Sequence, residues 1–172
     1  MLSAAEQLPR PKFGNVQPST HIPSWLTENL TEALTFPMVE IQYSDRNNTF
    51  SRTDFRSWLT FTIDGSDAKD LDDAISMARY TNGDFLLGVH IADVSEYVKE
   101  GEDIDLEALK RTTSIYTPNR VIPMLPEILS NDLCSLHPGE PKLTLSILMR
   151  LCGDGTVVGS FVTEGVIQSQ QK

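Results

Sequence analysis

Two pairs of segments between residues 74 and 167 alternate apolar and polar residues with the period of a β-strand. Residues 74–80 and 85–94 form the first pair, and the Asn-Gly dipeptide between them suits a tight hairpin turn. Residues 143–151 and 157–167 form the second pair, around the turn sequence CGDG. The pattern therefore predicts two antiparallel hairpins.

The segments before these hairpins follow other patterns. Ser24 can cap a helix, and apolar residues continue at helical spacing until Pro37 ends the pattern. The polar residues 44–54 predict a loop, whereas the aromatic and β-branched run at residues 58–63 predicts a strand. Further along, Asp105 can cap a short helix through the sequence LEALKR.

Two stretches are rich in proline. Residues 1–23 predict an extended lead-in or linker rather than a packed element. Residues 116–136 predict a loop with one turn of helix near residues 127–129. For residues 24–172 the pattern predicts an α/β (α+β) fold, with a mixed, largely antiparallel sheet and flanking helices.

Composition limits the class of protein. With 172 residues and 40% hydrophobic content, the chain can build one domain with a core. Its net charge of −10 disfavours a phosphate backbone as partner, unless metal ions or basic segments elsewhere supply the attraction. Cys134 and Cys152 lack a zinc or disulfide spacing, and no apolar run approaches the ~20 residues of a membrane span. We therefore expect a cytoplasmic protein without a membrane partner.

The stretch DGSDAKDLDD, residues 64–73, places five aspartates in ten positions directly after the strand predicted at residues 58–63. Aspartate is common in turns and caps, so a solvated loop is one interpretation. The other is a metal site: close carboxylates repel by roughly 1 kcal/mol per pair in water and by more when partly buried, which a cation would offset. Hard divalent ions such as Mg²⁺ prefer carboxylate oxygens.

Spacing refines the metal interpretation without excluding the solvated loop. Asp70 and Asp72 share a face if the loop is extended, and Asp73 points to the other face. Asp64, at the end of the predicted strand, is a natural additional ligand. The group indicates one or two ions held between loop and strand, an arrangement used in phosphodiester hydrolysis.

Three motifs then carry a resemblance to a known family. FTIDGSDAKDLDDAI, VHIADVSEYV and TSIYTPNRVIPMLPEILSNDLCSL resemble the RNB catalytic domain of the ribonuclease II and ribonuclease R family, in one register from about Arg52 to Ile167. The resemblance implies a hydrolytic exoribonuclease that acts from the 3′ end of single-stranded RNA and releases nucleoside 5′-monophosphates with Mg²⁺.

The resemblance also implies roles for particular residues. The four positions that match the acidic catalytic and metal-binding residues of the family are Asp64, Asp70, Asp72 and Asp73. Tyr116 matches a tyrosine that packs against RNA near the active site. Asp67 is not among the four and is interpreted as shaping the loop.

Three other residues stand out less. We expect His90, between apolar neighbours in a strand, to be a structural histidine. Asp93 at the end of that strand can cap or orient a loop. Arg120 is compatible with a salt bridge or with a phosphate contact.

The extent of the match limits the expectation of activity. Family members carry OB-type RNA-binding domains and a longer catalytic domain, which includes an arginine-bearing motif that this sequence lacks. We therefore expect a partial RNB catalytic domain, incomplete at its C-terminal end and weak or inactive alone. Two alternatives stay open. One is a metal-binding or subunit-docking module, which pairs with a complementary C-terminal fragment or with itself; the other is a domain with purely structural aspartates.

Overall fold

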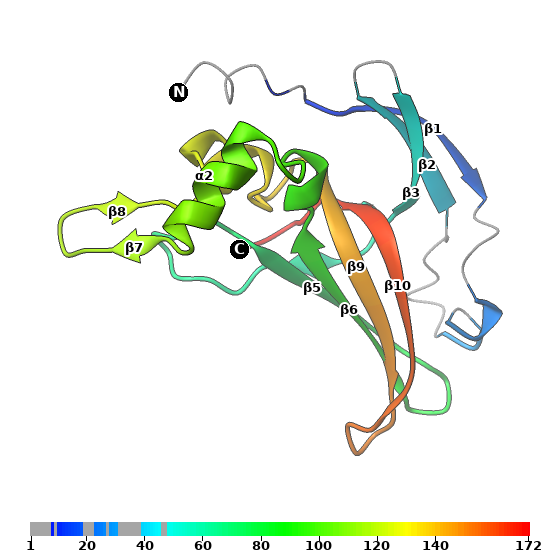
Figure 1. The fold of residues 1–172 in the computed structure, drawn as a ribbon. Helices are drawn as coiled ribbons and strands as arrows, with labels where there is room; N and C mark the ends of the chain where they lie inside the picture. Colours follow the sequence, from blue (N-terminus) through cyan, green and yellow to red (C-terminus); the bar gives the residue numbers. More distant parts are fainter. Residues whose placement is uncertain (1–7, 9, 19–22, 27, 31–38, 46–47) are drawn as a thin grey trace.

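We describe the fold from a computed structural model. The structure describes residues 8, 10–18, 23–26, 28–30, 39–45 and 48–172. Most of the described strands join one curled sheet of eight strands in the order β1-β2-β3-β10-β9-β6-β5-β4 (Figure 1). The strands of this sheet are β1 (Lys12–Pro18), β2 (Val39–Asp45), β3 (Asn48–Asp54), β4 (Thr60–Phe61), β5 (Asp73–Arg79), β6 (Phe85–Ala92), β9 (Lys142–Leu151) and β10 (Val157–Ile167).

Short helices and a small hairpin complete the described part of the chain. The hairpin extends away from the sheet beside the longest helix (Figure 1). These elements are the helices η1 (Ser24–Leu26), η3 (Val94–Glu96), α2 (Asp103–Arg111) and η4 (Leu129–Leu133), with the strands β7 (Ile115–Tyr116) and β8 (Val121–Ile122). No helix in these described ranges is both long enough and apolar enough to cross a bilayer.

The two hairpins predicted from alternation are confirmed. Strands β5 and β6 pair antiparallel, and Gly83 in their turn has a φ of 93°, a conformation that favours glycine. Strands β9 and β10 also pair antiparallel, and β6 joins β9 between the two hairpins. The prediction of a mixed, largely antiparallel sheet is therefore correct, and β10 adds a parallel pairing with β3.

The central strands have one fully buried face and one partly exposed face. On β5 the residues Ala74, Ser76 and Ala78 are buried, whereas Met77 between them is 57% exposed. The pairing register places further apolar residues on the exposed face, which we call the outer face: Ile75, Met77, Ile91, Leu145 and Val162. The buried face packs against the core aromatic residues Phe55, Trp58 and Tyr80.

Two predictions near the N-terminus are corrected. Residues 44–54, predicted as a loop, are mostly the end of β2 and the strand β3. The sheet accommodates Thr53 and Asp54 because their side chains are paired: Thr53 shares a hydrogen bond with Thr163, and Asp54 accepts two from the guanidinium of Arg56. Conversely, the strand predicted at residues 58–63 is only the two-residue β4, and Ile63 is 79% exposed.

Other boundaries shift. Strand β1 lies inside the predicted lead-in of residues 1–23 and pairs with β2 at the edge of the sheet, where Pro18 is tolerated. The helix predicted from Ser24 is only the three-residue η1, because Leu30 already pairs with Tyr80 in a β-bridge. Residues 31–38 of that prediction lie outside the described residues. Helix α2 begins at Asp103 rather than after Asp105, and η4 extends beyond the predicted turn.

Candidate functional site

The aspartate-rich loop, residues 64–73, connects β4 to β5 and is fastened to the core at its centre. Leu71 is completely buried, and it separates Asp70 from Asp72 in the sequence. Asp72 is exposed and Asp70 is partly exposed, as expected for an extended segment with alternating side chains. The loop therefore has an apolar anchor that turns the two flanking carboxylates away from the core.

Hydrogen bonds to the backbone fix the same part of the loop. The hydroxyl of Ser135 donates to the carbonyl of Lys69 at 2.7 Å and accepts from the amide of Leu71 at 3.0 Å. The amide of Leu136 donates to the carbonyl of Leu71 at 2.9 Å. The amide of Ala92, the last residue of β6, donates to the carbonyl of Asp72 at 2.9 Å. These bonds order the loop independently of any bound ion.

The four aspartates predicted as site residues share one electrostatic environment. The pKa of Asp72 is raised, first by partial desolvation and then by the negative charges of Asp70, Asp73 and Asp64. We call these four residues the acidic cluster. The three neighbouring charges thus disfavour ionisation of Asp72, and a bound cation would relieve this repulsion.

The carboxylates of the acidic cluster do not converge on one metal position in this structure. Within the described ranges, no three side chains of His, Cys, Asp or Glu are arranged to hold one metal ion. The oxygen donors have the chemistry that Mg²⁺ prefers, and their mutual repulsion fits a divalent ion. Binding would therefore require the carboxylates to move toward one another.

Tyr116, the predicted RNA-contacting residue, lies next to the acidic cluster. Its hydroxyl donates a hydrogen bond of 3.0 Å to Oδ2 of Asp70, and its ring is 67% exposed. The bond to Asp70 and the charge of that carboxylate are the main causes that raise the pKa of Tyr116. The β7–β8 hairpin thus presents an accessible aromatic ring beside the carboxylate of Asp70.

Positive charge also reaches the loop. The ammonium of Lys172 donates to the carbonyl oxygens of Ala68 at 2.5 Å and Ser66 at 3.4 Å. The segment before it runs beside β4, where the amide of Gln170 donates to the carbonyl of Thr60 at 2.9 Å. The C-terminal residues of the chain therefore lie against the first half of the loop.

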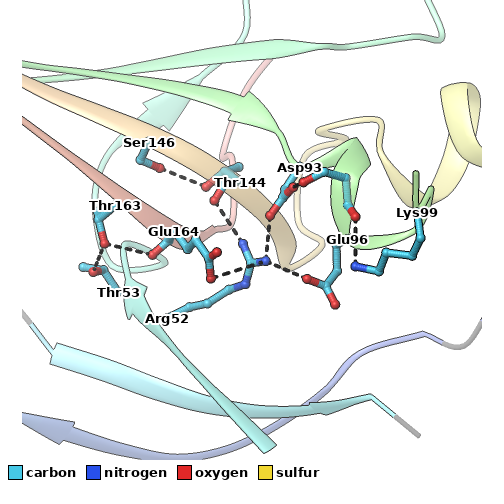
Figure 2. A network of polar contacts seen from close by, with 10 residues as sticks. Arg52, Thr53, Asp93, Glu96, Lys99, Thr144, Ser146, Thr163 and Glu164 are labelled. Atoms are coloured by element: carbon cyan, nitrogen blue, oxygen red, sulfur yellow. Dashed lines mark hydrogen bonds and ion pairs between the residues drawn. The ribbon is translucent and has the colours of Figure 1, made fainter. Parts of the chain in front are cut away.

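A second charged group lies on the other side of β6 and is buried. The guanidinium of Arg52 donates to carboxylates of Asp93 at 2.6 Å and Glu96 at 2.9 Å, and to the carbonyl of Thr144 at 3.2 Å (Figure 2). Glu164 lies 3.8 Å from the same guanidinium. We call Arg52, Asp93 and Glu96 the Arg52 cluster. Sequence reasoning missed Arg52, because its partners are more than 40 residues away in the sequence.

The Arg52 cluster shows the role of Asp93. Burial opposes ionisation of this carboxyl, but hydrogen bonds from Ser95 and Arg52 hold its pKa below the usual range. Its amide donates to the carbonyl of Leu143 at 3.0 Å, directly after the bond from Ala92 to the acidic loop. Asp93 stands at the N-cap of η3, but its side chain makes no capping hydrogen bond and pairs with Arg52 and Ser95 instead. Its role in orienting a loop stays a prediction.

His90 is the structural histidine that was predicted. It is completely buried, with Nε2 2.9 Å from the hydroxyl of Ser76 and Nδ1 2.9 Å from that of Ser146. Burial lowers its pKa to about 4, so the ring is neutral at pH 7. The neighbouring Gly88 is required, because a Cβ there would lie 2.4 Å from the Ser76 hydroxyl and 2.9 Å from the His90 ring.

The two remaining residues gain little from the structure. The backbone of Arg120 closes the β7–β8 turn with Thr117, and its guanidinium forms no ion pair with the described residues. The phosphate contact of Arg120 stays a prediction. Asp67 is exposed in the first half of the loop, and its loop-shaping role also stays a prediction.

Comparisons with known proteins agree with this geometry. The family model of the RNB domain matches residues 52–172. Ribonuclease R of Thermotoga maritima is 46% identical over 163 residues, which cover 90% of this chain and 23% of that protein. A structure of Mycoplasma genitalium RNase R in complex with ribose-methylated single-stranded RNA superposes with a TM-score of 0.67 at 38% identity, covering 70% of this chain and 19% of that one. A structure of yeast Ssd1, a pseudonuclease, gives a TM-score of 0.63 at 26% identity, covering 70% of this chain and 15% of that one.

The fold and the family match thus define part of an RNB domain. The chain belongs to the RNB domain family, and the ribonuclease R resemblance of its motifs is confirmed. It spans less than a quarter of the length of the Thermotoga maritima relative.

Proposed function

We propose that this chain is the N-terminal part of the catalytic domain of a cytoplasmic 3′→5′ exoribonuclease that hydrolyses single-stranded RNA to nucleoside 5′-monophosphates. The main support is the electrostatic coupling of Asp64, Asp70 and Asp73 to Asp72. Partial burial and three neighbouring carboxylates raise the pKa of Asp72, and such a group of four is poised to bind a cation beside a phosphate. The free cysteines, Cys134 and Cys152, suit a reducing compartment.

The acidic cluster would hold Mg²⁺, with Asp70 and Asp72 fixed by the ordered half of the loop and Asp64 and Asp73 on either side. When bound, the ion supplies Lewis-acid stabilisation of the scissile phosphate and lowers the pKa of an attacking water. The carboxylates themselves would orient that water by accepting its hydrogen bonds. Release of Asp70 from Tyr116 would free an oxygen for this role.

Tyr116 would contact the RNA strand at the acidic cluster. Its ring is exposed and lies on a hairpin that projects beside the loop (Figure 1). Stacking of a base on an accessible aromatic ring is worth roughly 1–3 kcal/mol and does not depend on sequence. The ring would therefore hold the terminal nucleotides of any single strand near the carboxylates.

An activity assay tests the proposal. The purified chain, alone and mixed with a fragment that supplies the remaining part of the RNB domain, is incubated with 5′-labelled single-stranded RNA and MgCl₂. We expect Mg²⁺-dependent release of nucleoside 5′-monophosphates with the mixture, and weak or no release with the chain alone. Asp72→Asn should abolish the reaction, because the developing negative charge on the phosphate loses its metal.

Asp67→Asn is the matched control for this experiment. It removes the same charge from the same loop, at a position that is not among the causes of the raised pKa of Asp72. Its activity should equal that of the unmodified chain. Equal losses in Asp67→Asn and Asp72→Asn would show that the loop needs its overall charge rather than the acidic cluster.

A second candidate function is a docking module without catalysis. Two observations favour it: the similarity to Ssd1, a pseudonuclease, and the apolar outer face of the sheet, where Val162 is 55% and Leu145 is 45% exposed. If the chain is a docking module, the remaining part of an RNB domain would cover this face. Sedimentation of the mixture would then detect a complex that forms without hydrolysing RNA, whereas sedimentation of the chain alone would reveal self-association.

A further inference from the structure

Ser135 forms an unusual pair of contacts with the aspartate-rich loop. It follows η4 in the chain and is completely buried, more than 60 residues from the loop in sequence. Its hydroxyl donates to the carbonyl of Lys69 at 2.7 Å and accepts from the amide of Leu71 at 3.0 Å. One oxygen atom thus bonds the backbone immediately before and immediately after Asp70.

These two contacts matter because strand pairing supplies no partner at this point. Strand β5 begins only at Asp73, so residues 69–71 lie outside the ladder with β6. A buried backbone group without a partner destabilises the fold by about the free energy of a lost hydrogen bond. The hydroxyl of Ser135 satisfies one donor and one acceptor of this segment and does so with a single, rigidly placed atom.

From this geometry we infer that Ser135 is a positioning residue for the acidic cluster, fixing the backbone on which Asp70 and Asp72 stand. The inference rests on the proposed function, in which those carboxylates bind Mg²⁺. Ser135 does not reach the ion or the RNA itself. It acts through Lys69 and Leu71, as residues behind metal ligands commonly do when they hold the ligands in place.

The chain offers a closely matched control in Ser169. This serine is 1% exposed, and its hydroxyl donates to the carbonyl of Leu136 at 3.0 Å. Ser169→Ala therefore removes a buried hydrogen bond from a serine hydroxyl to the backbone carbonyl of Leu136, the residue that follows Ser135. It leaves both contacts of Ser135 with the loop intact.

The test measures the affinity of the full 172-residue chain for Mn²⁺, a spectroscopic substitute for Mg²⁺, by electron paramagnetic resonance. We expect Ser135→Ala to weaken binding about 10-fold to 100-fold, the range found when groups that orient metal ligands are removed. Ser169→Ala should bind Mn²⁺ as the unmodified chain does. Equal affinities for the two alanine variants would overturn the inference.

A measurement without metal separates this inference from the proposed function. Amide exchange at Leu71 should be at least about 10-fold faster in Ser135→Ala than in Ser169→Ala, because that amide loses its acceptor. Unchanged exchange would contradict the role of Ser135 whether or not the chain binds metal. If exchange at Leu71 is faster in Ser135→Ala but the unmodified chain binds no Mn²⁺, the metal site proposed above fails and the positioning contact stands.

Ser135→Cys covers the case in which Ser135→Ala does not fold. A thiol has a similar size but is a weaker donor and acceptor, so the loop should be held less firmly. We expect amide exchange at Leu71 and Mn²⁺ affinity between those of the unmodified chain and those of a chain with no contact. Full retention of both properties in Ser135→Cys would argue against the hydroxyl as the positioning group.

Discussion

The Arg52 cluster and the acidic cluster both contain carboxylates, but the surroundings of these carboxylates differ. In the Arg52 cluster, the guanidinium of Arg52 contacts two carboxylates, and the pKa of Asp93 is lowered by Ser95 and Arg52 against the effect of burial. In the acidic cluster no such cation faces Asp72 among the causes of its shift, and its pKa is raised. The presence of a cationic partner thus identifies a carboxylate that stabilises the fold. The absence of such a partner identifies a carboxylate that is available for function.

The two clusters give opposite contributions to the pH dependence of stability. Because the folded pKa of Asp93 is lowered, its contribution is complete above the usual aspartate pKa of about 3.9 and is lost as the pH falls through the folded value. Because the folded pKa of Asp72 is raised, this residue favours the fold at low pH, and that contribution is lost as the pH rises through the folded value. The fold therefore tolerates the acidic cluster at neutral pH at a cost in stability.

Removing the cation of the Arg52 cluster should produce the largest effect. Arg52→Met leaves the buried carboxylate of Asp93 without its partner, so we expect the free energy of unfolding to fall by about 3–5 kcal/mol. Urea denaturation at pH 7 measures this change. Arg111→Met breaks an exposed pair with Glu107 and an exposed hydrogen bond to the carbonyl of Pro123, and it should lower the free energy by less than about 0.5 kcal/mol. A comparable loss in both variants would contradict the distinction between buried and exposed pairs.

Titration of His90 should produce the next largest effect, because burial lowers the pKa of its ring well below the usual value. The folded pKa of about 4 lies below the usual histidine pKa of about 6.5, so only the unfolded chain gains a proton between these values. This proton uptake should lower the free energy of unfolding by roughly 3 kcal/mol as the pH falls from 7 to 4. Urea denaturation across this pH range should show a slope that His90→Asn removes, and a slope that persists in His90→Asn would assign it to other groups.

In the acidic cluster, removal of one charge should have a smaller effect of opposite sign. Asp72→Asn relieves repulsion with Asp70, Asp73 and Asp64, so the metal-free chain should gain less than about 1 kcal/mol, as solvent screens these exposed groups. The variant should also lose the rise in melting temperature that Mg²⁺ gives the unmodified chain. Thermal denaturation with and without MgCl₂ measures both, and an unchanged response to Mg²⁺ would remove Asp72 from the site.

The contact between Tyr116 and Asp70 should have the smallest effect on stability. Tyr116→Phe removes an exposed hydrogen bond, so the free energy of unfolding should change by no more than about 0.5 kcal/mol. The contact has a spectroscopic signature, because Asp70 raises the pKa of Tyr116. Asp70→Asn should lower that pKa in an ultraviolet titration, and Tyr116→Phe should remove the same titrating group. No change in Asp70→Asn would mean that the contact does not persist in solution.

Local patterns in the sequence predicted the parts of the fold that depend on neighbouring residues. The β5–β6 and β9–β10 hairpins follow from alternation and from turn residues such as Gly83. Strand β3 was predicted as a loop because its residues are polar, and it is stabilised by pairing with β2 and, over 100 residues away, with β10. Tertiary contacts overrode local propensity there.

The same limit applies to the site. The acidic residues were found because they lie close together in sequence, and the alternation around Leu71 placed Asp70 and Asp72 correctly on the outside of the loop. Ser135 and Arg52 gave no local signal, because each acts on a segment more than 40 residues away. Groups that hold a site in place are distributed along the chain, whereas ligands of one ion can be consecutive.

The parallel pairing of β3 with β10 has a consequence for biosynthesis. Thr53 pairs with Gly165 and Asp54 with Val166. Strand β3 can therefore pair with β10 only after residues more than 100 positions later have been synthesised. On a ribosome, β1, β2 and β3 would leave the exit tunnel as a meander with an open edge, long before that edge finds its neighbour. Such late closure favours slow folding and gives chaperones a natural substrate during translation.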